Sequence, residues 1–293
     1  MSQTHDAPSS QAALARAPWG LRTLARAPLP LLRALGWGVG RLLYGLAWPR
    51  RRVVFDNLQR CFPEQPQACR RRVAKQVFVH FAQSWLDRLW LWHADEAVLR
   101  QRLQLTGDVT ALQSAQAQVL FAPHFMGLDA GWTVLTLKLA RPMVTLYARH
   151  PSPTQDRWIA QGRSRFAPQG LLPRVGSVKA AVKAMRQGAA LYLLPDMDLG
   201  AHNAVFVPFM GNTAATVTAL PRFAALGHAP VLAVRTLMTP TGYETQVGAS
   251  WPDYPTGDDL ADATYMNAFL EAWVREHPEQ YYWVHRRFKT QPK

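Results

Sequence analysis

The sequence contains few cysteines and few acidic residues. Its 293 residues include two cysteines, Cys61 and Cys69, which give no metal-ligand pattern, so a reducing compartment is the simpler expectation. Lysine and arginine number 33 against 19 aspartates and glutamates, which gives a formal net charge of +14. We therefore expect an anionic partner, although charge alone does not choose among nucleic acid, anionic lipid and an acidic protein.

Two motifs of common enzyme classes are missing from the chain. No Gly-x-Ser-x-Gly elbow is present, so a serine acyl-enzyme has no support in the sequence. Residues 36–40 are rich in glycine, but they lack the preceding strand and the further glycine spacing of a dinucleotide-binding loop.

The N-terminal region lacks an uninterrupted apolar run long enough to be a clear membrane span. Residues 29–48 have about the required length, but Arg33 and Arg41 interrupt them. Arginine, tryptophan and leucine are interleaved over residues 16–52, a composition that favours a helix lying in the headgroup region of an anionic membrane. The alternative is a helix packed on the protein's own core. Residues 1–15 have the composition of a disordered tail.

The rest of the chain, residues 53–293, reads as one domain in which strands and helices alternate. The apolar spacing predicts helices over residues 53–103. Strand-like apolar runs then occur at 119–122, 143–148, 189–194 and 231–237, with helices expected near 130–139, 153–166, 177–187 and 214–227. This alternation predicts an α/β fold with its functional site at the ends of strands.

The best candidate for catalysis is His124 together with Asp129, directly after the apolar run 119–122. Imidazole titrates near neutrality and can accept a proton from a hydroxyl, and a carboxylate can hold the ring in the required tautomer. The two side chains can meet if His124 lies in the turn after the strand and Asp129 lies in the first turn of the next helix. Pro123 and Gly127 suit such a turn. A core histidine beside an unrelated helix-start aspartate remains the alternative.

From about residue 50 to residue 292 the chain resembles the bacterial lipid A biosynthesis (late) acyltransferases, which are related to the lysophospholipid and glycerophosphate acyltransferases. Besides His124 and Asp129, the blocks that carry the resemblance lie at residues 52–58 with 61–64, 194–200, 205–211 with 215–216, and 281–290. Their order along the chain matches that of the family. Asp129 stands where many relatives have glutamate.

The resemblance implies a fold with a mixed central sheet flanked by helices, behind an N-terminal membrane-associated helical segment. It implies an O-acyltransferase that moves a fatty acyl chain from an acyl carrier protein thioester, or from acyl-CoA, to a hydroxyl of a lipid A precursor. His124 would act as the base and Asp129 would orient it. The implied location is the cytoplasmic face of the bacterial inner membrane, on an anionic surface, with no cofactor, no metal and no nucleic acid required.

Six further residues are candidates for the substrate site. Guanidinium groups can bind phosphate bidentately, and the basic positions of the family fall loosely on four arginines of this chain. The Asp-Met-Asp block at 196–198 resembles an Asp-Gln-Asp block of the family, and a loop-ordering role is favoured for its carboxylates over Mg²⁺ binding. The six candidates are Arg149, Arg163, Arg165, Arg174, Asp196 and Asp198.

Two other functions remain open at this stage. The same chemistry could serve a lysophospholipid, an aminolipid or another glycolipid, because pocket length and headgroup contacts decide the acceptor. The chain could also be a non-catalytic membrane or nucleic-acid binding protein that merely carries the motif.

Overall fold

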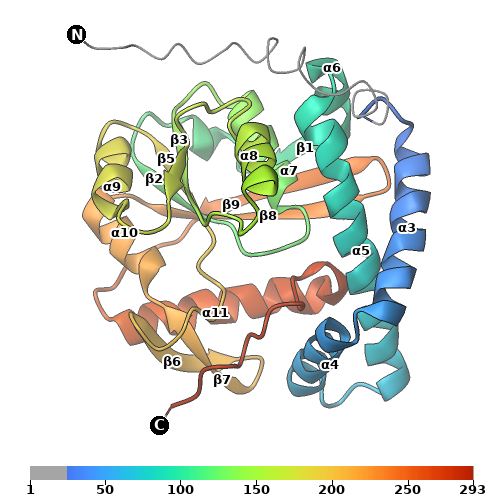
Figure 1. The fold of residues 1–293 in the computed structure, drawn as a ribbon. Coiled ribbons are helices and arrows are strands. Elements are labelled where there is room, and N and C mark those ends of the chain that lie inside the picture. The colour runs from blue at the N-terminus through green and yellow to red at the C-terminus, as the bar shows by residue number, and fades with distance from the viewer. Residues whose placement is uncertain (1–24, 293) are drawn as a thin grey trace.

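The computed structural model describes residues 25–292, and a seven-stranded sheet lies at its centre (Figure 1). The predicted tail at residues 1–15 and the start of the predicted membrane-associated segment lie outside the described residues. In spatial order the strands of the sheet are β1 (Leu103–Gly107), β9 (Gly242–Ser250), β8 (Val231–Thr239), β2 (Gln118–Phe121), β5 (Ala190–Leu193), β3 (Met143–Tyr147) and β4 (Leu171–Pro173).

The central sheet is mixed but mostly parallel. Strands β8 and β9 pair antiparallel, and the other neighbouring strands of the sheet pair in parallel. Parallel strands need helical crossovers, which cover the faces of the sheet. The predicted α/β fold with a mixed central sheet flanked by helices is therefore confirmed.

A separate two-stranded hairpin, β6 (Ala204–Phe209) and β7 (Asn212–Val217), corrects one prediction. A helix was expected over residues 214–227, but residues 214–217 belong to β7, and helix α10 spans Ala219–Gly227. Strand β7 pairs along its whole length with β6, so tertiary pairing decides the local structure here.

Helices cover both faces of the sheet. Along β2 the side chains alternate: Val119 and Phe121 join one buried apolar cluster, and Leu120 and Ala122 join another. The first cluster includes side chains of α9 (Val178–Arg186), α10 and α11 (Asp259–Glu276). The second includes side chains of α7 (Leu128–Lys138) and α8 (Pro153–Arg163). The remaining helices are α3 (Leu29–Leu46), α4 (Trp48–Cys61), α5 (Gln67–His93), α6 (Glu96–Arg102) and the short η1 (Thr110–Gln113) and η2 (Pro278–Gln280).

Helix α3 lies along α5 at the edge of the molecule (Figure 1). Gly40 makes this close approach possible, because a Cβ atom there would lie 2.5 Å from the Cα atom of Val79 on α5. The opposite face of α3 is apolar and exposed, with Leu31, Leu35, Leu42 and Leu46 at helical spacing. Among residues 25–292, none of the helices has both the length and the apolar character needed to cross a membrane.

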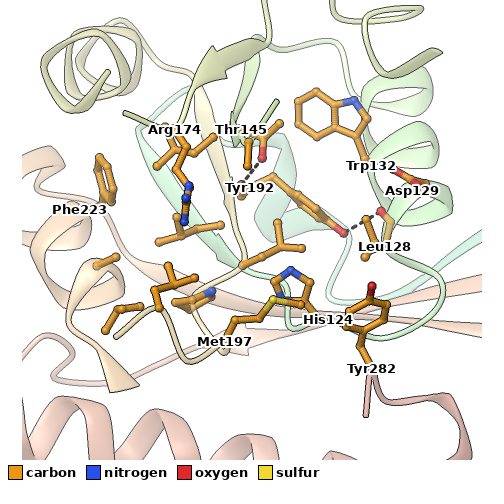
Figure 2. Close-up of a pocket in the computed structure, with 18 of the residues that line it drawn as sticks. His124, Leu128, Asp129, Trp132, Thr145, Arg174, Tyr192, Met197, Phe223 and Tyr282 are labelled. Carbon is orange, nitrogen blue, oxygen red and sulfur yellow. Dashed lines mark hydrogen bonds between the residues drawn. The ribbon is translucent and has the colours of Figure 1, made fainter. Parts of the chain in front are cut away.

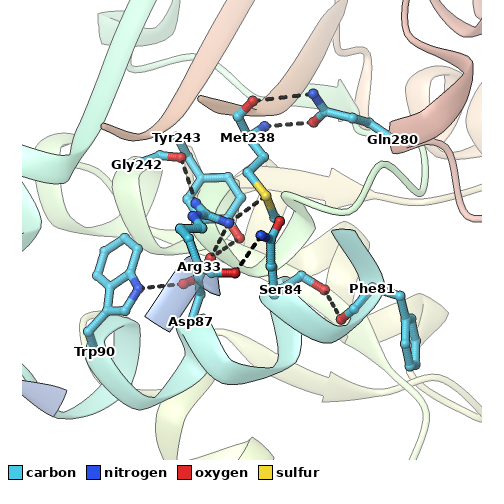
Figure 3. Close-up of polar contacts among 10 residues, drawn as sticks. Arg33, Phe81, Ser84, Asp87, Trp90, Met238, Gly242, Tyr243 and Gln280 are labelled. Carbon is cyan, nitrogen blue, oxygen red and sulfur yellow. Dashed lines mark hydrogen bonds and ion pairs between the residues drawn. The ribbon is translucent and has the colours of Figure 1, made fainter. Parts of the chain in front are cut away.

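A buried polar cluster fixes α3 to the α/β domain (Figure 3). Arg33 of α3 forms an ion pair with Asp87 of α5 at 2.9 Å and donates to the backbone oxygen of Gly242 at 3.2 Å. The same carboxylate accepts hydrogen bonds from Tyr243 at 2.6 Å and from Trp90 at 2.8 Å. Arg33 thus points inward, and the alternative of packing on the protein's own core holds for this face of α3.

Candidate functional site

Two neighbouring parallel strands bring His124 and Asp196 together. Strands β2 and β5 pair in parallel, with Phe121 opposite Leu193, and the amide of Ala122 donates to the carbonyl of Leu193 at 2.9 Å. His124 follows Phe121 by three positions, and Asp196 follows Leu193 by the same interval. The carboxyl ends of parallel strands lie at one edge of a sheet, so the two side chains meet there.

Asp196 holds the imidazole of His124 in one orientation. The Nδ1 atom of His124 lies 2.7 Å from one carboxylate oxygen of Asp196. The other oxygen accepts hydrogen bonds from the backbone amide of His124 and from the hydroxyl of Tyr281, both at 3.0 Å. A carboxylate only accepts, so Nδ1 carries the proton, and in the neutral ring Nε2 keeps its free lone pair.

The carboxyl group of Asp196 is ionised at neutral pH. Asp196 is fully buried, and burial alone would raise its pKa. The charge of His124 and the hydrogen bonds from His124 and Tyr281 outweigh burial and lower the pKa of Asp196 below its usual value. The residue therefore remains a hydrogen-bond acceptor for His124 throughout the neutral range.

The predicted partner of His124, Asp129, is engaged elsewhere. Asp129 lies in the first turn of α7, where one oxygen accepts from Nε of Arg163 at 2.7 Å and the other from Nε of Arg88 at 2.8 Å. Figure 2 shows Asp129 beside Trp132, away from the His124 ring. Among the described residues no hydrogen bond joins Asp129 to His124. The contact that orients the His124 ring therefore comes from Asp196 and not from Asp129. The position of Asp129 on α7 directs its carboxylate toward α5 and α8.

The two arginines control the ionisation of Asp129. Burial would raise the pKa of its carboxyl, but the guanidinium groups of Arg163 and Arg88 outweigh burial and lower the pKa to about 2. Arg88 also lies over the ring of Trp85, with its central carbon 3.9 Å from the ring centroid. The three charged groups thus form a buried network between α5, α7 and α8.

Replacing Asp129 with asparagine should destabilise the fold by about 3–5 kcal/mol at neutral pH, because two buried guanidinium groups lose their counter-charge. A carboxyl with a lowered folded-state pKa stabilises the fold above its unfolded pKa, near 3.8, and this contribution disappears as the pH falls toward about 2. Denaturant unfolding of both proteins at a series of pH values should show their difference shrinking over that acidic window. A difference that stays constant down to about pH 2 would contradict the assigned ion pairs.

His124 faces a wide cavity of about 920 Å³. The residues that line it fall into two groups on either side of His124 and Met197, as Figure 2 shows for Trp132 and Asp129 on one side and Arg174 and Phe223 on the other. Apolar side chains predominate in the lining. A cavity of this size with a few charged groups is typical of a ligand site.

The cavity has an apolar rim, made of lining residues that are exposed to solvent. These are Val175, Val178, Leu199 and Leu226, and Val175 is exposed by 85% of its surface. These side chains come from the loop after β4, from α9, from the loop after β5 and from α10. Exposed apolar residues gathered at a cavity mouth favour the entry of an apolar ligand.

The turn that carries His124 is fixed on both sides. A Cβ atom on Gly127 would lie 2.6 Å from the backbone oxygen of Thr236, so only glycine allows the turn to approach β8 this closely. The hydroxyl of Tyr192 donates to the carbonyl of Leu128 at 3.1 Å, as drawn in Figure 2. The site is therefore built on the sheet and not on a free loop.

The other candidate residues from the sequence occupy different places. Arg163 and Arg174 line the cavity. Arg165 donates to the backbone oxygens of Leu91 and Ala94 at 3.2 and 2.6 Å, and it is not among the lining residues. Arg149 is exposed outside the lining.

Asp198 is buried and does not line the cavity. Its carboxylate accepts from the amide and the hydroxyl of Thr290, both at 2.8 Å, and from the amide of Gly200 at 3.0 Å. These contacts tie the loop after β5 to the C-terminal segment, as a loop-ordering role for Asp198 requires. Asp196 differs, because its carboxylate contacts His124 and does not line the cavity.

Sequence reasoning missed two residues of this site. Arg88 lies within the helical pattern of residues 53–103, which carries no signal that one of its arginines reaches a buried carboxylate. Tyr281 belongs to the C-terminal block that carries the resemblance, but its hydrogen bond to Asp196 could be found only from the folded structure. The feature of the sequence that points to Asp196 as a site residue is its position directly after a buried strand.

Comparison with known proteins gives consistent results over nearly the whole chain. The family model described as bacterial lipid A biosynthesis acyltransferase matches residues 17–290. A lipid A biosynthesis lauroyltransferase of Escherichia coli (strain K12) is 29% identical over 273 residues, 91% of this chain and 88% of that protein. A lipid A biosynthesis palmitoleoyltransferase of the same organism is 28% identical over 272 residues, 90% of this chain and 87% of that protein.

A third relative differs again in the acyl group that its name gives. A lipid A biosynthesis myristoyltransferase of Escherichia coli (strain K12) is 27% identical over 266 residues, 89% of this chain and 80% of that protein. The family model covers far more than half of the chain. The chain therefore belongs to the bacterial lipid A biosynthesis acyltransferases, enzymes that transfer acyl groups.

Proposed function

We propose that the protein transfers a fatty acyl chain from an acyl carrier protein thioester to a hydroxyl of a lipid A precursor, by direct attack with His124 as the base and Asp196 as its orienting acid. The observation that carries this proposal is the 2.7 Å contact between Asp196 and Nδ1 of His124, on a ring that lines the cavity. That contact leaves Nε2 as the nitrogen able to accept a proton from an acceptor hydroxyl.

The proposed reaction proceeds in two steps at His124. Nε2 takes the proton of the acceptor hydroxyl while the oxygen attacks the thioester carbonyl carbon and forms the new C–O bond. The C–S bond then breaks, the electron pair leaves with the sulfur, and the imidazolium returns the proton to that sulfur. Asp196 favours the imidazolium between the two steps and takes no covalent part.

The cavity lining supports a phosphorylated lipid as the acceptor class. Its apolar surface and apolar rim suit acyl chains, and Arg174 and Arg222 line the cavity near that rim. Guanidinium groups bind phosphates by charge and by hydrogen bonding, as an acceptor with phosphate groups requires. The relatives named above are acyltransferases of lipid A biosynthesis according to their names.

The charge of the chain and the exposed face of α3 support the proposed donor and location. A net charge of +14 attracts an acidic carrier protein. The exposed leucine face of α3 suits shallow insertion into a bilayer, with the inner face of the same helix held by Arg33. We place the enzyme on the cytoplasmic face of the bacterial inner membrane.

Incubation of the purified protein with an acyl carrier protein thioester and a tetra-acylated lipid A precursor should yield a product heavier by one acyl chain, detected by mass spectrometry. Parallel reactions with acyl-CoA, and with a lysophospholipid as acceptor, test the two alternative substrates. Product from the lysophospholipid and none from the lipid A precursor would overturn the proposed acceptor. Faster transfer from acyl-CoA than from the carrier protein would overturn the proposed donor.

A further inference from the structure

A second cavity is lined by residues of α3, α4 and α5. Its volume is about 590 Å³, and none of its lining residues lines the cavity at His124. Three aromatic side chains form part of its wall: Tyr44 of α3, and Trp48 and Phe55 of α4. The rings of Tyr44 and Phe55 pack edge to face, with centroids 6.4 Å apart.

Four cations complete the wall of this cavity: Arg51, Arg52, Arg71 and Lys75. Arg51 lies over the ring of Tyr44 at 5.3 Å from the centroid and donates to the backbone oxygen of Tyr44 at 3.1 Å. The ammonium of Lys75 lies 5.9 Å from the same centroid. One aromatic ring thus positions two cations from two helices at a single opening.

These cations have no carboxylate to neutralise them. Within residues 25–292 no carboxylate forms an ion pair with any of the four. The sequences of α3, α4 and α5 hold only two carboxylates, and one of them, Asp87, is paired with Arg33 in the buried cluster. The other, Asp56, is exposed on α4. Four clustered positive charges repel one another, so a bound anion would stabilise this arrangement.

The surroundings of the cavity identify the kind of anion. The exposed leucine face of α3 leads along the helix to Leu46, exposed by 72%, and then to Trp48 at the cavity wall. An apolar face beside cations and a tryptophan matches the depth profile of a membrane surface, where acyl chains are followed outward by phosphates and headgroups. A nucleic acid or an acidic protein would not require the exposed leucines.

We propose that this cavity binds the phosphate of an anionic phospholipid headgroup, with Arg51 and Lys75 as the phosphate ligands and Trp48 at the headgroup boundary. This site is separate from the acyl-transfer cavity. Arg51 supplies a planar fork for two phosphate oxygens, and Lys75 supplies a point charge from the neighbouring helix. The leucines of α3 then enter the lipid beside it.

Binding to vesicles tests the proposal on the full-length protein. Sedimentation with phosphatidylcholine vesicles that contain phosphatidylglycerol should show that the double variant Arg51→Gln/Lys75→Gln binds about tenfold more weakly than wild type or worse. The matched control is Arg157→Gln/Arg275→Gln, which removes the same charge from exposed positions on α8 and α11 and should change affinity by about twofold at most. Equal losses in the two double variants would overturn the proposal.

A charge-conserving variant separates a defined site from a diffuse basic surface. Arg51→Lys keeps the charge but loses the planar fork, so it should weaken binding to the anionic vesicles by several-fold, about threefold or more. Unchanged binding by Arg51→Lys would contradict phosphate ligation by Arg51. Thermal melting of each variant should stay close to wild type, since these side chains reach an open cavity and Arg51 has only a half-buried hydrogen bond, to the backbone of Tyr44, to lose.

An acidic carrier protein is the rival occupant. It would be indicated if Arg51→Gln/Lys75→Gln bound vesicles like wild type but raised KM for the carrier-protein thioester in detergent micelles, and that outcome would overturn the lipid assignment. Vesicle binding needs no turnover, so the result stands independently of the proposed acyl-transfer chemistry.

Discussion

Replacement of His124 by alanine is expected to lower kcat for acyl transfer by about 10²-fold or more, the scale of a lost general base. The reason is geometric, because Asp196 occupies Nδ1 of His124 and leaves Nε2 facing the cavity as the proton acceptor. Initial rates with saturating thioester and acceptor measure the effect directly. KM for both substrates should change little, since the imidazole acts on the reacting atoms and binds neither acyl chain nor phosphate.

His202 provides the matched control. It lines the same cavity at an exposed position in the loop after β5. His202→Ala should keep kcat within about twofold of wild type, because the proposed mechanism gives this ring no proton to transfer. A wild-type rate in His124→Ala, with its melting temperature unchanged, would rule out His124 as the base.

Asp196→Asn is expected to lower kcat by up to about 10⁴-fold, the loss seen when the orienting acid of a catalytic histidine is replaced by its amide. An amide can donate to Nδ1, which would place the ring proton on Nε2 and remove the base from the cavity. The folded-state pKa of Asp196 is lowered, so its carboxylate is present throughout the neutral range and its own protonation should not limit activity above about pH 4. Rate–pH profiles of wild type and variant measure both points.

Asp129→Asn serves as the comparison, because the two aspartates make different contacts. Asp129 holds Arg88 and Arg163, so its replacement should reduce stability strongly, whereas replacement of Asp196 should reduce kcat strongly. Denaturant unfolding and initial rates measured on both variants separate the two roles. A larger fall in kcat for Asp129→Asn than for Asp196→Asn, on folded protein, would restore Asp129 as the acid that supports the base.

Much of the strand and helix pattern could be predicted from local sequence. The apolar run expected as a strand at 143–148 is β3, and the helix expected near 153–166 is α8. Each of these segments has a hydrophobic period that matches its structure. Strands β1, β4, β6, β7 and β9 were not predicted. Strands β1, β7 and β9 contain polar residues and are defined by their pairing partners. Strands β4 and β6 are short apolar segments that each contain a proline, which argues against a strand in the sequence alone.

The candidate site shows the same limit. His124 could be selected from its place after a buried strand, but its partner could not be selected from spacing. Asp196 lies far from His124 in sequence, and only the parallel pairing of β2 with β5 places them together. Asp129 is close in sequence, yet its helix directs it to Arg88 and Arg163. Strand order is a property of the whole chain, and no local pattern contains it.

Helix α3 illustrates how one segment can suit two predicted roles. Arg33 interrupts the segment as a membrane span, and in the fold it lies on the inner face and forms an ion pair with Asp87. The apolar residues on the opposite face remain exposed. Composition identified the mixture of charge and leucine, and the helical arrangement places Arg33 and the exposed leucines on opposite faces.

Helix α5 has a consequence for how the enzyme selects its acceptor. Lys75 near one end of this helix belongs to the proposed headgroup cavity, and Arg88 further along belongs to the cavity at His124. At the rise of an α-helix the two side chains are roughly 20 Å apart along its axis. With α3 packed against it through Gly40, α5 acts as a rigid spacer. Because α3 would lie in the plane of the membrane, this spacing would run along the membrane surface and fix the distance from the proposed headgroup cavity to the reacting atoms. Under the two proposals, only an acceptor whose hydroxyl reaches His124 at that distance, while its chains remain anchored, would be acylated.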